Sequence, residues 1–224
     1  MSLTVHSIIM GMSTAYLIES DAGLVLVDAG LPRYERKVVR RIRALGRDAL
    51  GLIFITHAHL DHYGSAAALR RLTGAPIAIH RADGDAMARG LTPLGSVHRR
   101  GRSLWALLRL FEPCLRPEPT AADVLLDDGD DLRAYGLDAV VLHTPGHTPG
   151  SSCLIVEGRI AFVGDLLSTT VRPRVQRSFA HDWSLIPDSL ARLQALRPEW
   201  VYAGHGCRPL SGRALQRLTC EPLT

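Results

Sequence analysis

Three histidines and an aspartate stand within six residues, in the stretch Thr56-His-Ala-His-Leu-Asp-His. They follow a short apolar run, Gly51 to Ile55, that is typical of a buried strand. Burying such polar side chains costs free energy unless they are paired or bind a metal. Imidazole and carboxylate groups are good ligands for zinc and for first-row metals generally. The spacing H-x-H-x-D-H therefore indicates a metal site at the end of this strand.

The motif has room for more than one metal ion. His57 and His59 are two residues apart, so in an extended loop both side chains point to the same side. Asp61 and His62 lie beyond them and can reach a second point. Two metal ions would use all four side chains, and such pairs generally lie about 3.5–4 Å apart. The motif therefore predicts two neighbouring metal positions.

Further candidate ligands stand just after predicted strands elsewhere in the chain. Each is next to Gly or Pro residues, which permit sharp turns and a close approach of the backbone to a metal. The candidates are His147 in HTPGHTPG, Asp165 in AFVGDLL and His205 in YAGHG.

With these residues the chain resembles the metallo-β-lactamase-fold hydrolase superfamily, and it is most similar to the branch that contains glyoxalase II and the lactonases. The resemblance runs from VLVDAG, Val25 to Gly30, through Ala203-Gly-His-Gly206. It implies seven ligands, of which three bind one metal ion, three bind the other and one bridges both. These are His57, His59 and His147 for the first ion, Asp61, His62 and His205 for the second, and Asp165 as the bridge.

The resemblance also implies a mixed α/β (α+β) fold, a four-layered αβ/βα sandwich with the metals at the edge between two sheets. The hydrophobic pattern predicts two strand-rich halves, each followed by helices, which agrees with that fold. The pattern predicts strands over 3–9, 14–19, 24–27, 51–55, 77–79, 124–126, 137–142, 152–156, 159–163 and 200–203, and helices over 34–45, 65–72, 187–196 and 210–218.

The activity implied by the resemblance is that of a dinuclear metal-dependent hydrolase. A hydroxide bridging two divalent ions would attack the carbonyl of a small ester, thioester, lactone or amide. Asp61 is the expected catalytic residue, which orients the hydroxide and passes a proton to the leaving group. Asp28 matches a family position whose carboxylate could orient a ligand histidine, although an ordinary turn aspartate would look the same. We expect zinc, and because a set of only His and Asp ligands is less selective for zinc, iron and manganese are alternatives.

Other classes of protein share this fold. A mononuclear iron oxidoreductase of the persulfide dioxygenase type uses part of the same ligand set, and a metal count near one with iron would favour it. Nucleases of the superfamily usually carry extra RNA-contacting segments, which we do not recognise in the sequence. Little sequence follows His205, so the helical domain that binds the glutathione thioester in glyoxalase II is not expected.

Residues 81–119 interrupt the rhythm of strands and helices, and we expect them to be an insertion in a single domain over 1–224. Their stretch SLWALLRLFEPCL carries apolar residues at helical spacing. Plain packing on the sandwich would explain this helix, and so would a lid over the metals, which we favour. Trp105 and Phe111, with His181 after the Asp165 loop, are then expected to contact a substrate with an apolar portion. The surplus apolar surface also suggests a homodimer.

The composition is that of a globular protein, with 46% hydrophobic and 21% charged residues among 224. The net charge is +4, but the arginines are scattered, so no nucleic-acid partner is expected. The four cysteines form no C-x-x-C pair, which favours reduced thiols in a cytoplasmic protein. The first residues do not match a signal peptide, and no apolar run approaches the roughly 20 residues that a membrane span needs.

Overall fold

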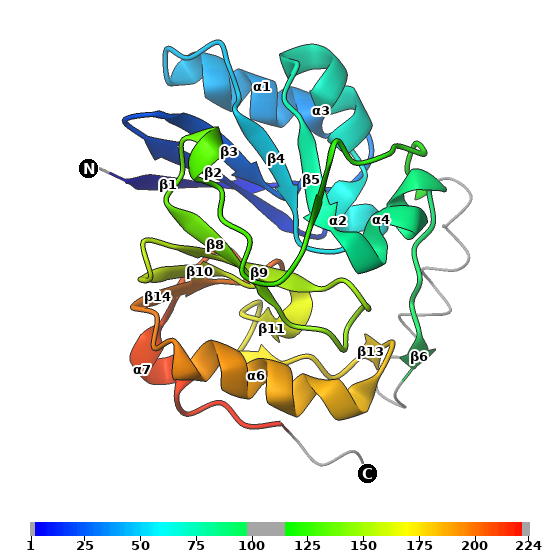
Figure 1. Ribbon diagram of the computed structural model, residues 1–224, viewed down its shortest axis with the longest axis vertical. Coiled ribbons are helices and arrows are strands. Elements are labelled where there is room, and N and C mark those ends of the chain that lie inside the picture. The colour runs from blue at the N-terminus through cyan, green and yellow to red at the C-terminus, as the bar shows by residue number, and fades with distance from the viewer. Residues whose placement is uncertain (1–2, 98–114, 221–224) are drawn as a thin grey trace.

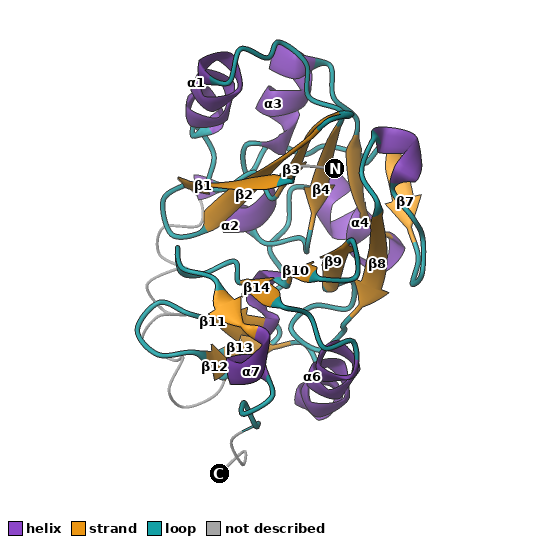
Figure 2. Cartoon of the chain, turned by 90° about the vertical axis from the view of Figure 1, so that its left-hand side faces the viewer, coloured by secondary structure: helices purple, strands orange, loops and turns teal. Residues whose placement is uncertain are grey.

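Two β-sheets face each other and carry helices on their outer sides in the computed structural model, which describes residues 3–97 and 115–220 (Figure 1). From top to bottom, Figure 1 shows helices α1 and α3, the first sheet, the second sheet and helix α6. The view turned by 90° shows the same succession of layers (Figure 2). The expected four-layered αβ/βα sandwich is therefore confirmed.

The first sheet has the strand order β1-β2-β3-β4-β5-β7. Its first three strands form an antiparallel meander, and β3, β4, β5 and β7 run parallel. Three helices pack on its outer face. The elements are β1 (Thr4–Ile9), β2 (Thr14–Ser20), β3 (Gly23–Val27), β4 (Leu52–Ile55), β5 (Ile77–His80) and β7 (Val124–Leu126), with helices α1 (Glu35–Ala44), α3 (Ala66–Thr73) and α4 (Arg81–Ala88).

The second sheet has the order β15-β14-β10-β9-β8, in which only β10 and β14 pair in parallel among the described strands. Shorter elements lie between these strands and helices along the chain. The second sheet and its helices are β8 (Ala139–His143), β9 (Ser152–Val156), β10 (Ile160–Phe162), β14 (Trp200–Tyr202), β15 (Leu210–Ser211), α6 (Ile186–Ala195) and α7 (Gly212–Leu215); the short elements are α2 (Leu60–Tyr63), β6 (Ser96–Val97), β11 (Leu167–Ser168), β12 (Arg174–Val175), β13 (Phe179–Ala180) and 3₁₀ turns over Arg133–Tyr135, Gly164–Leu166 and Trp183–Leu185.

Strand β4 shows why this sequence builds a layered core. Side chains alternate between the two faces of a strand. Leu52 and Phe54 pack between the sheets, whereas Ile53 and Ile55 pack under the outer helices. All four side chains are fully buried, because both faces of the strand are covered. A parallel strand that is covered on both faces has a continuous apolar run. The H-x-H-x-D-H motif follows this run directly and therefore lies at the edge of the sheet.

Two expectations about secondary structure differ from the structure. Helix α4 was not expected, because Gly84 in its middle is a poor helix former. An added Cβ at Gly84 would lie 2.8 Å from the end of the Leu125 side chain, so a larger residue there would require that side chain to shift. The helix predicted over 210–218 is wrong in its extent: Leu210 pairs with Val201 as a strand, and α7 covers only Gly212–Leu215.

The proposed lid helix, with Trp105 and Phe111, lies outside the described residues, so the inserted lid stays a prediction. The described residues at the start of the segment 81–119 lie beside the sheet edge that carries the H-x-H-x-D-H motif. Strand β6 pairs there with β13, and the carbonyl oxygen of Pro93 lies 2.9 Å from a ring nitrogen of His59. Within the described ranges, no helix has the length and apolarity needed to cross a membrane.

Candidate metal centre

The structure brings all seven predicted ligands together at one edge of the sandwich. Each follows the carboxyl end of a strand: β4 leads to the H-x-H-x-D-H motif, β8 to His147, β10 to Asp165 and β14 to His205. Because β10 and β14 are parallel neighbours, the residues that follow them must meet. Helix α2 begins inside the motif at Leu60 and carries Asp61 and His62, and the ring of His62 lies with its centroid 4.1 Å from that of His57.

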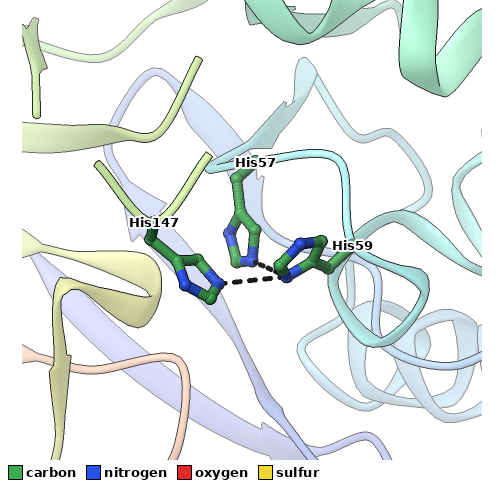
Figure 3. A group of neighbouring side chains, drawn as sticks. All are labelled: His57, His59 and His147. Atoms are coloured by element: carbon green, nitrogen blue, oxygen red, sulfur yellow. Dashed lines mark hydrogen bonds between the residues drawn. The ribbon is translucent and has the colours of Figure 1, made fainter. Parts of the chain in front are cut away.

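The first cluster consists of His57, His59 and His147, whose rings converge in Figure 3. Nδ1 of His59 lies 3.1 Å from Nε2 of His57 and 3.0 Å from Nε2 of His147. The outer nitrogens of His59 and His147 lie 2.9 and 3.1 Å from the carbonyl oxygens of Pro93 and Phe179. A carbonyl only accepts hydrogen bonds, so these outer nitrogens carry the hydrogens. The inner nitrogens then present lone pairs to one another, an arrangement that suits a shared cation.

The second cluster consists of Asp61, His62 and His205. Nε2 of His205 lies 3.5 Å from a carboxylate oxygen of Asp61, and Nε2 of His62 lies 3.8 Å from the same oxygen. His205 is oriented from outside, since its Nδ1 lies 2.9 Å from the carbonyl oxygen of Met12. The structure thus places imidazole and carboxylate donors around a second point.

Asp165 lies between the two clusters. Its Oδ2 is 3.5 Å from Nε2 of His147 in the first cluster and 3.1 Å from Nε2 of His205 in the second. Its Oδ1 is 3.2 Å from Nε2 of His62, yet both of these buried atoms lack a hydrogen-bond partner. Buried polar atoms are normally satisfied, so these two need an additional partner. A divalent cation would satisfy a carboxylate oxygen and an imidazole nitrogen at once, so the residues fit a metal ion.

The histidines of the first cluster stay in their neutral form even without a metal ion. Burial, and next the neighbouring His62, lowers the pKa of His57 well below its ordinary value. Burial, and next His59, lowers the pKa of His147 to about 3. A histidine that stays neutral near pH 7 keeps the lone pair of one ring nitrogen free for a metal. These histidines are therefore prepared as metal ligands.

The second cluster attracts positive charge. Burial acts to lower the pKa of His62 and of His205, but Asp165 and other carboxylates outweigh it. The result is a pKa well above the ordinary value for His62, and of about 9 for His205. Burial likewise acts to raise the pKa of Asp165, but His205 and His62 hold it well below its usual range. Negative charge at this buried point therefore has to be balanced by protons or by a metal cation.

Asp28 supports histidines of both clusters. Its Oδ2 accepts a 2.8 Å hydrogen bond from Nδ1 of His62, which leaves Nε2 of His62 facing the second cluster. The Thr56 hydroxyl donates to the Asp28 carboxylate at 3.0 Å and lies 3.0 Å from Nδ1 of His57. Since that hydroxyl gives its hydrogen to Asp28, it can accept one from His57. These contacts favour the orienting role that we considered for Asp28 over that of an ordinary turn residue.

Glycines allow the strand ends to approach this closely. An added Cβ at Gly204 would lie 2.5 Å from the ring of His62 and 2.8 Å from the carboxylate of Asp165. Real Cβ atoms essentially never make such contacts, so only glycine fits between these side chains. The Gly that precedes His205 in the sequence is thus part of the packing of the site.

A buried carboxylate that the sequence did not single out also supports the site. Asp83 in helix α4 is 1% exposed. It accepts hydrogen bonds from the backbone nitrogen of Ala58 at 2.8 Å, the hydroxyl of Thr148 at 2.7 Å and the backbone nitrogen of Gly150 at 2.7 Å. Ala58 lies between the first two histidines, and Thr148 follows His147. Asp83 therefore joins the two loops that form the first cluster.

Replacing Asp83 by Ala should destabilise the protein by about 3 kcal/mol, because three buried donors would lose their acceptor. Urea unfolding of the metal-loaded protein measures this loss. Asp85→Ala is the matched control, since Asp85 is exposed on the same helix and pairs with the exposed Arg89. Equal unfolding midpoints for the two variants would show that Asp83 does not hold the loops.

Of the residues expected to contact substrate, the structure describes His181, whereas Trp105 and Phe111 lie outside the described residues. His181 is exposed, and its backbone nitrogen donates a hydrogen bond to the carbonyl oxygen of His147. The nearer side chain is that of Phe179, whose ring centroid is 5.4 Å from the His147 ring and 5.9 Å from the His59 ring. Phe179 therefore forms an apolar wall beside the first cluster.

Several known proteins are similar to this chain over most of its length. The hydroxyacylglutathione hydrolase of Aeromonas hydrophila subsp. hydrophila is 30% identical over 191 residues, which cover 85% of this chain and 59% of that protein. The probable metallo-hydrolase YflN of Bacillus subtilis is 25% identical, over 93% of this chain and 86% of that protein. This chain thus spans about three fifths of the length of the first relative and most of the second.

Solved structures show the same fold. The crystal structure of TTHA1623 in a di-iron-bound form matches with a TM-score of 0.69 and 28% identity, over 95% of this chain and 97% of that one. The structure of BLEG-1 B3 metallo-beta-lactamase matches with a TM-score of 0.74 at 24% identity, over 94% and 95% of the two chains, and so shows the fold alone. The model of the metallo-beta-lactamase superfamily matches residues 9–205, a range that includes all seven candidate ligands. With this match and the His/Asp cluster at the expected edge of the fold, the chain belongs to the metallo-beta-lactamase superfamily.

Proposed function

We propose that this protein is a hydrolase that uses two divalent metal ions and water to cleave a small ester, thioester, lactone or amide at its carbonyl carbon. The observation that carries the proposal is the position of Asp165, whose Oδ2 lies within 3.5 Å of ligand nitrogens from both clusters. A carboxylate in that position suits two neighbouring ions better than one. In the proposal, His57, His59 and His147 hold the first ion, Asp61, His62 and His205 hold the second, and Asp165 contacts both.

Ions at these two points would polarise a carbonyl and lower the pKa of water to about 7. Asp61 is the residue we assign to proton transfer. Its side chain is 9% exposed and lies at the second cluster. A carboxylate at that place can orient the attacking water, take its proton and deliver that proton to the leaving group. Asp28 keeps His57 and His62 in the orientation that binding requires.

The names of similar proteins support this class of reaction. One relative is named hydroxyacylglutathione hydrolase, and a structural neighbour is described in a di-iron-bound form. For this chain we propose zinc as the metal, with iron or manganese as alternatives, because imidazole and carboxylate ligands accept all three. We also propose a substrate with an apolar portion, since Phe179, Leu167 and Val175 line a cavity beside the ligands.

Rates of hydrolysis on a panel of lactones, thioesters, β-lactams and phosphodiesters test the proposal. Metal-loaded protein should hydrolyse at least one carbonyl substrate, and removal of the metal by a chelator should abolish the activity. Hydrolysis of phosphodiesters alone would point to a nuclease. A single iron per chain with oxygen-dependent oxidation of a persulfide would point to the dioxygenase class. Either result would contradict the proposed carbonyl chemistry.

A further inference from the structure

A cavity of about 190 Å³ opens beside the metal centre. Asp165 and His205 form part of its wall, so a molecule in the cavity would touch the metal ligands. Polar side chains from the segment after Asp165 also line the cavity, among them Ser168, Arg174 and Gln176. The cavity is therefore placed to hold the part of a substrate that does not react.

The hairpin of β11 and β12 fixes the direction of Arg174. Leu167 pairs with Val175, and Ser168 pairs with Arg174. Leu167 and Val175 are buried in the core beneath α6. Because successive side chains alternate between the faces of a strand, Ser168 and Arg174 lie on the face opposite to this core packing, and both line the cavity. Ser168 also forms a bridge with His205, which attaches the hairpin to a metal ligand.

Arg174 differs from other arginines of the chain in its surroundings. Arg71, Arg81 and Arg192 each pair with a carboxylate on the surface, at 2.6 to 2.8 Å. Arg174 is half-buried, yet within residues 3–97 and 115–220 no carboxylate forms an ion pair with its guanidinium group. A partly desolvated cation is costly without an anion near it. Asp165 is the only acidic residue of the cavity wall as described, and it faces the metal ligands.

We propose that Arg174 binds a carboxylate group of the substrate, so that the enzyme prefers acidic carbonyl compounds over neutral ones. The planar guanidinium group can hold a carboxylate through two parallel hydrogen bonds, and this would direct the scissile carbonyl toward the metal ligands. The inference rests on the proposed function, since it names the class of substrate for the same site. Arg174 would contact substrate without taking part in proton transfer.

Three small thioesters, which differ in whether and on which side they carry a carboxylate, test the preference in the metal-loaded enzyme. The acetyl thioester of N-acetylcysteamine is neutral, the acetyl thioester of β-mercaptopropionic acid carries a carboxylate on the leaving side, and the glutaryl thioester of N-acetylcysteamine carries one on the acyl side. Arg174→Ala should raise KM for an acidic thioester at least about 10-fold, the scale of a lost charge-assisted hydrogen bond. It should leave kcat/KM for the neutral thioester unchanged.

Arg172→Ala is the matched control, because Arg172 is exposed on the same hairpin and does not line the cavity. This variant should behave as the wild type, and Arg174→Lys should keep part of the preference. Added salt should weaken the preference, since it screens the attraction between the charges. Equal effects of Arg174→Ala on acidic and neutral thioesters would overturn the inference while the proposed hydrolase stands.

Calorimetric titration of the metal-loaded protein with glutarate tests the subsite without turnover. Arg174→Ala should bind glutarate at least about 10-fold more weakly than Arg172→Ala does. If the two variants bind glutarate equally, or if the wild type does not bind it, the inference is wrong. If glutarate binding depends on Arg174 but none of the carbonyl substrates is hydrolysed, the subsite stands and the proposed reaction fails.

Discussion

Asp61→Asn should lower kcat at least about 100-fold, the scale of a lost general acid–base group, while the chain keeps its metal ions. The Asp61 carboxylate oxygen lies 3.5 Å from Nε2 of His205 and 3.8 Å from Nε2 of His62, at the point where the attacking water would bind. Asparagine has nearly the same shape and keeps one oxygen donor, but it cannot hold a proton. Steady-state kinetics together with elemental analysis of the same sample measures the effect.

The control for Asp61→Asn is Asp48→Asn, which alters an exposed carboxylate away from the ligands. That variant should keep the full rate. Undiminished kcat in Asp61→Asn at full metal content would remove Asp61 from proton transfer. A loss of metal together with the loss of rate would show instead that Asp61 matters mainly as a ligand.

Asp165→Asn should reduce the metal content to at most one ion per chain and lower kcat/KM about 10³-fold. The Asp165 carboxylate approaches ligands of both clusters. The amide of asparagine is neutral, so two cations bound at these points would have less negative charge beside them. The loss of one ion removes several kcal/mol of charge stabilisation in the transition state, which corresponds to a factor of this size. Metal content per chain and hydrolysis rate are measured on the same preparation.

Asp188→Asn serves as the comparison for Asp165→Asn, because Asp188 is exposed in helix α6. Circular dichroism should show that both variants are folded. Two ions and an unchanged rate in Asp165→Asn would mean that Asp165 does not bridge the ions and that the dinuclear site is described wrongly.

The sequence was sufficient where the information is local. The H-x-H-x-D-H motif contains four candidate ligands in six residues, and a continuous apolar run shows that a buried strand delivers them. His147, Asp165 and His205 were recognisable because each follows a strand and lies near glycine. The structure adds how far apart the donor atoms lie, which no spacing in the sequence could supply.

The residues that sequence analysis missed act through contacts between distant segments. Asp83 accepts hydrogen bonds from Ala58 and Gly150, which are 25 and 67 positions away in the sequence. It lies in helix α4, which the sequence pattern did not predict because Gly84 is a poor helix former. Pro93 contributes only a carbonyl oxygen, which any residue could offer. Two-residue strands such as β11 and β12 are too short to show a period, so the orientation of Arg174 could not be foreseen.

The most direct test of the dinuclear site is the metal content of wild-type protein purified without chelator. Elemental analysis by mass spectrometry, divided by the protein concentration from amino-acid analysis, should give two divalent ions per chain. Zinc should account for them, with iron or manganese in its place if the cell supplies those metals. A stable content of one ion per chain, with His62 and His205 unligated in a crystal structure of that protein, would contradict the account.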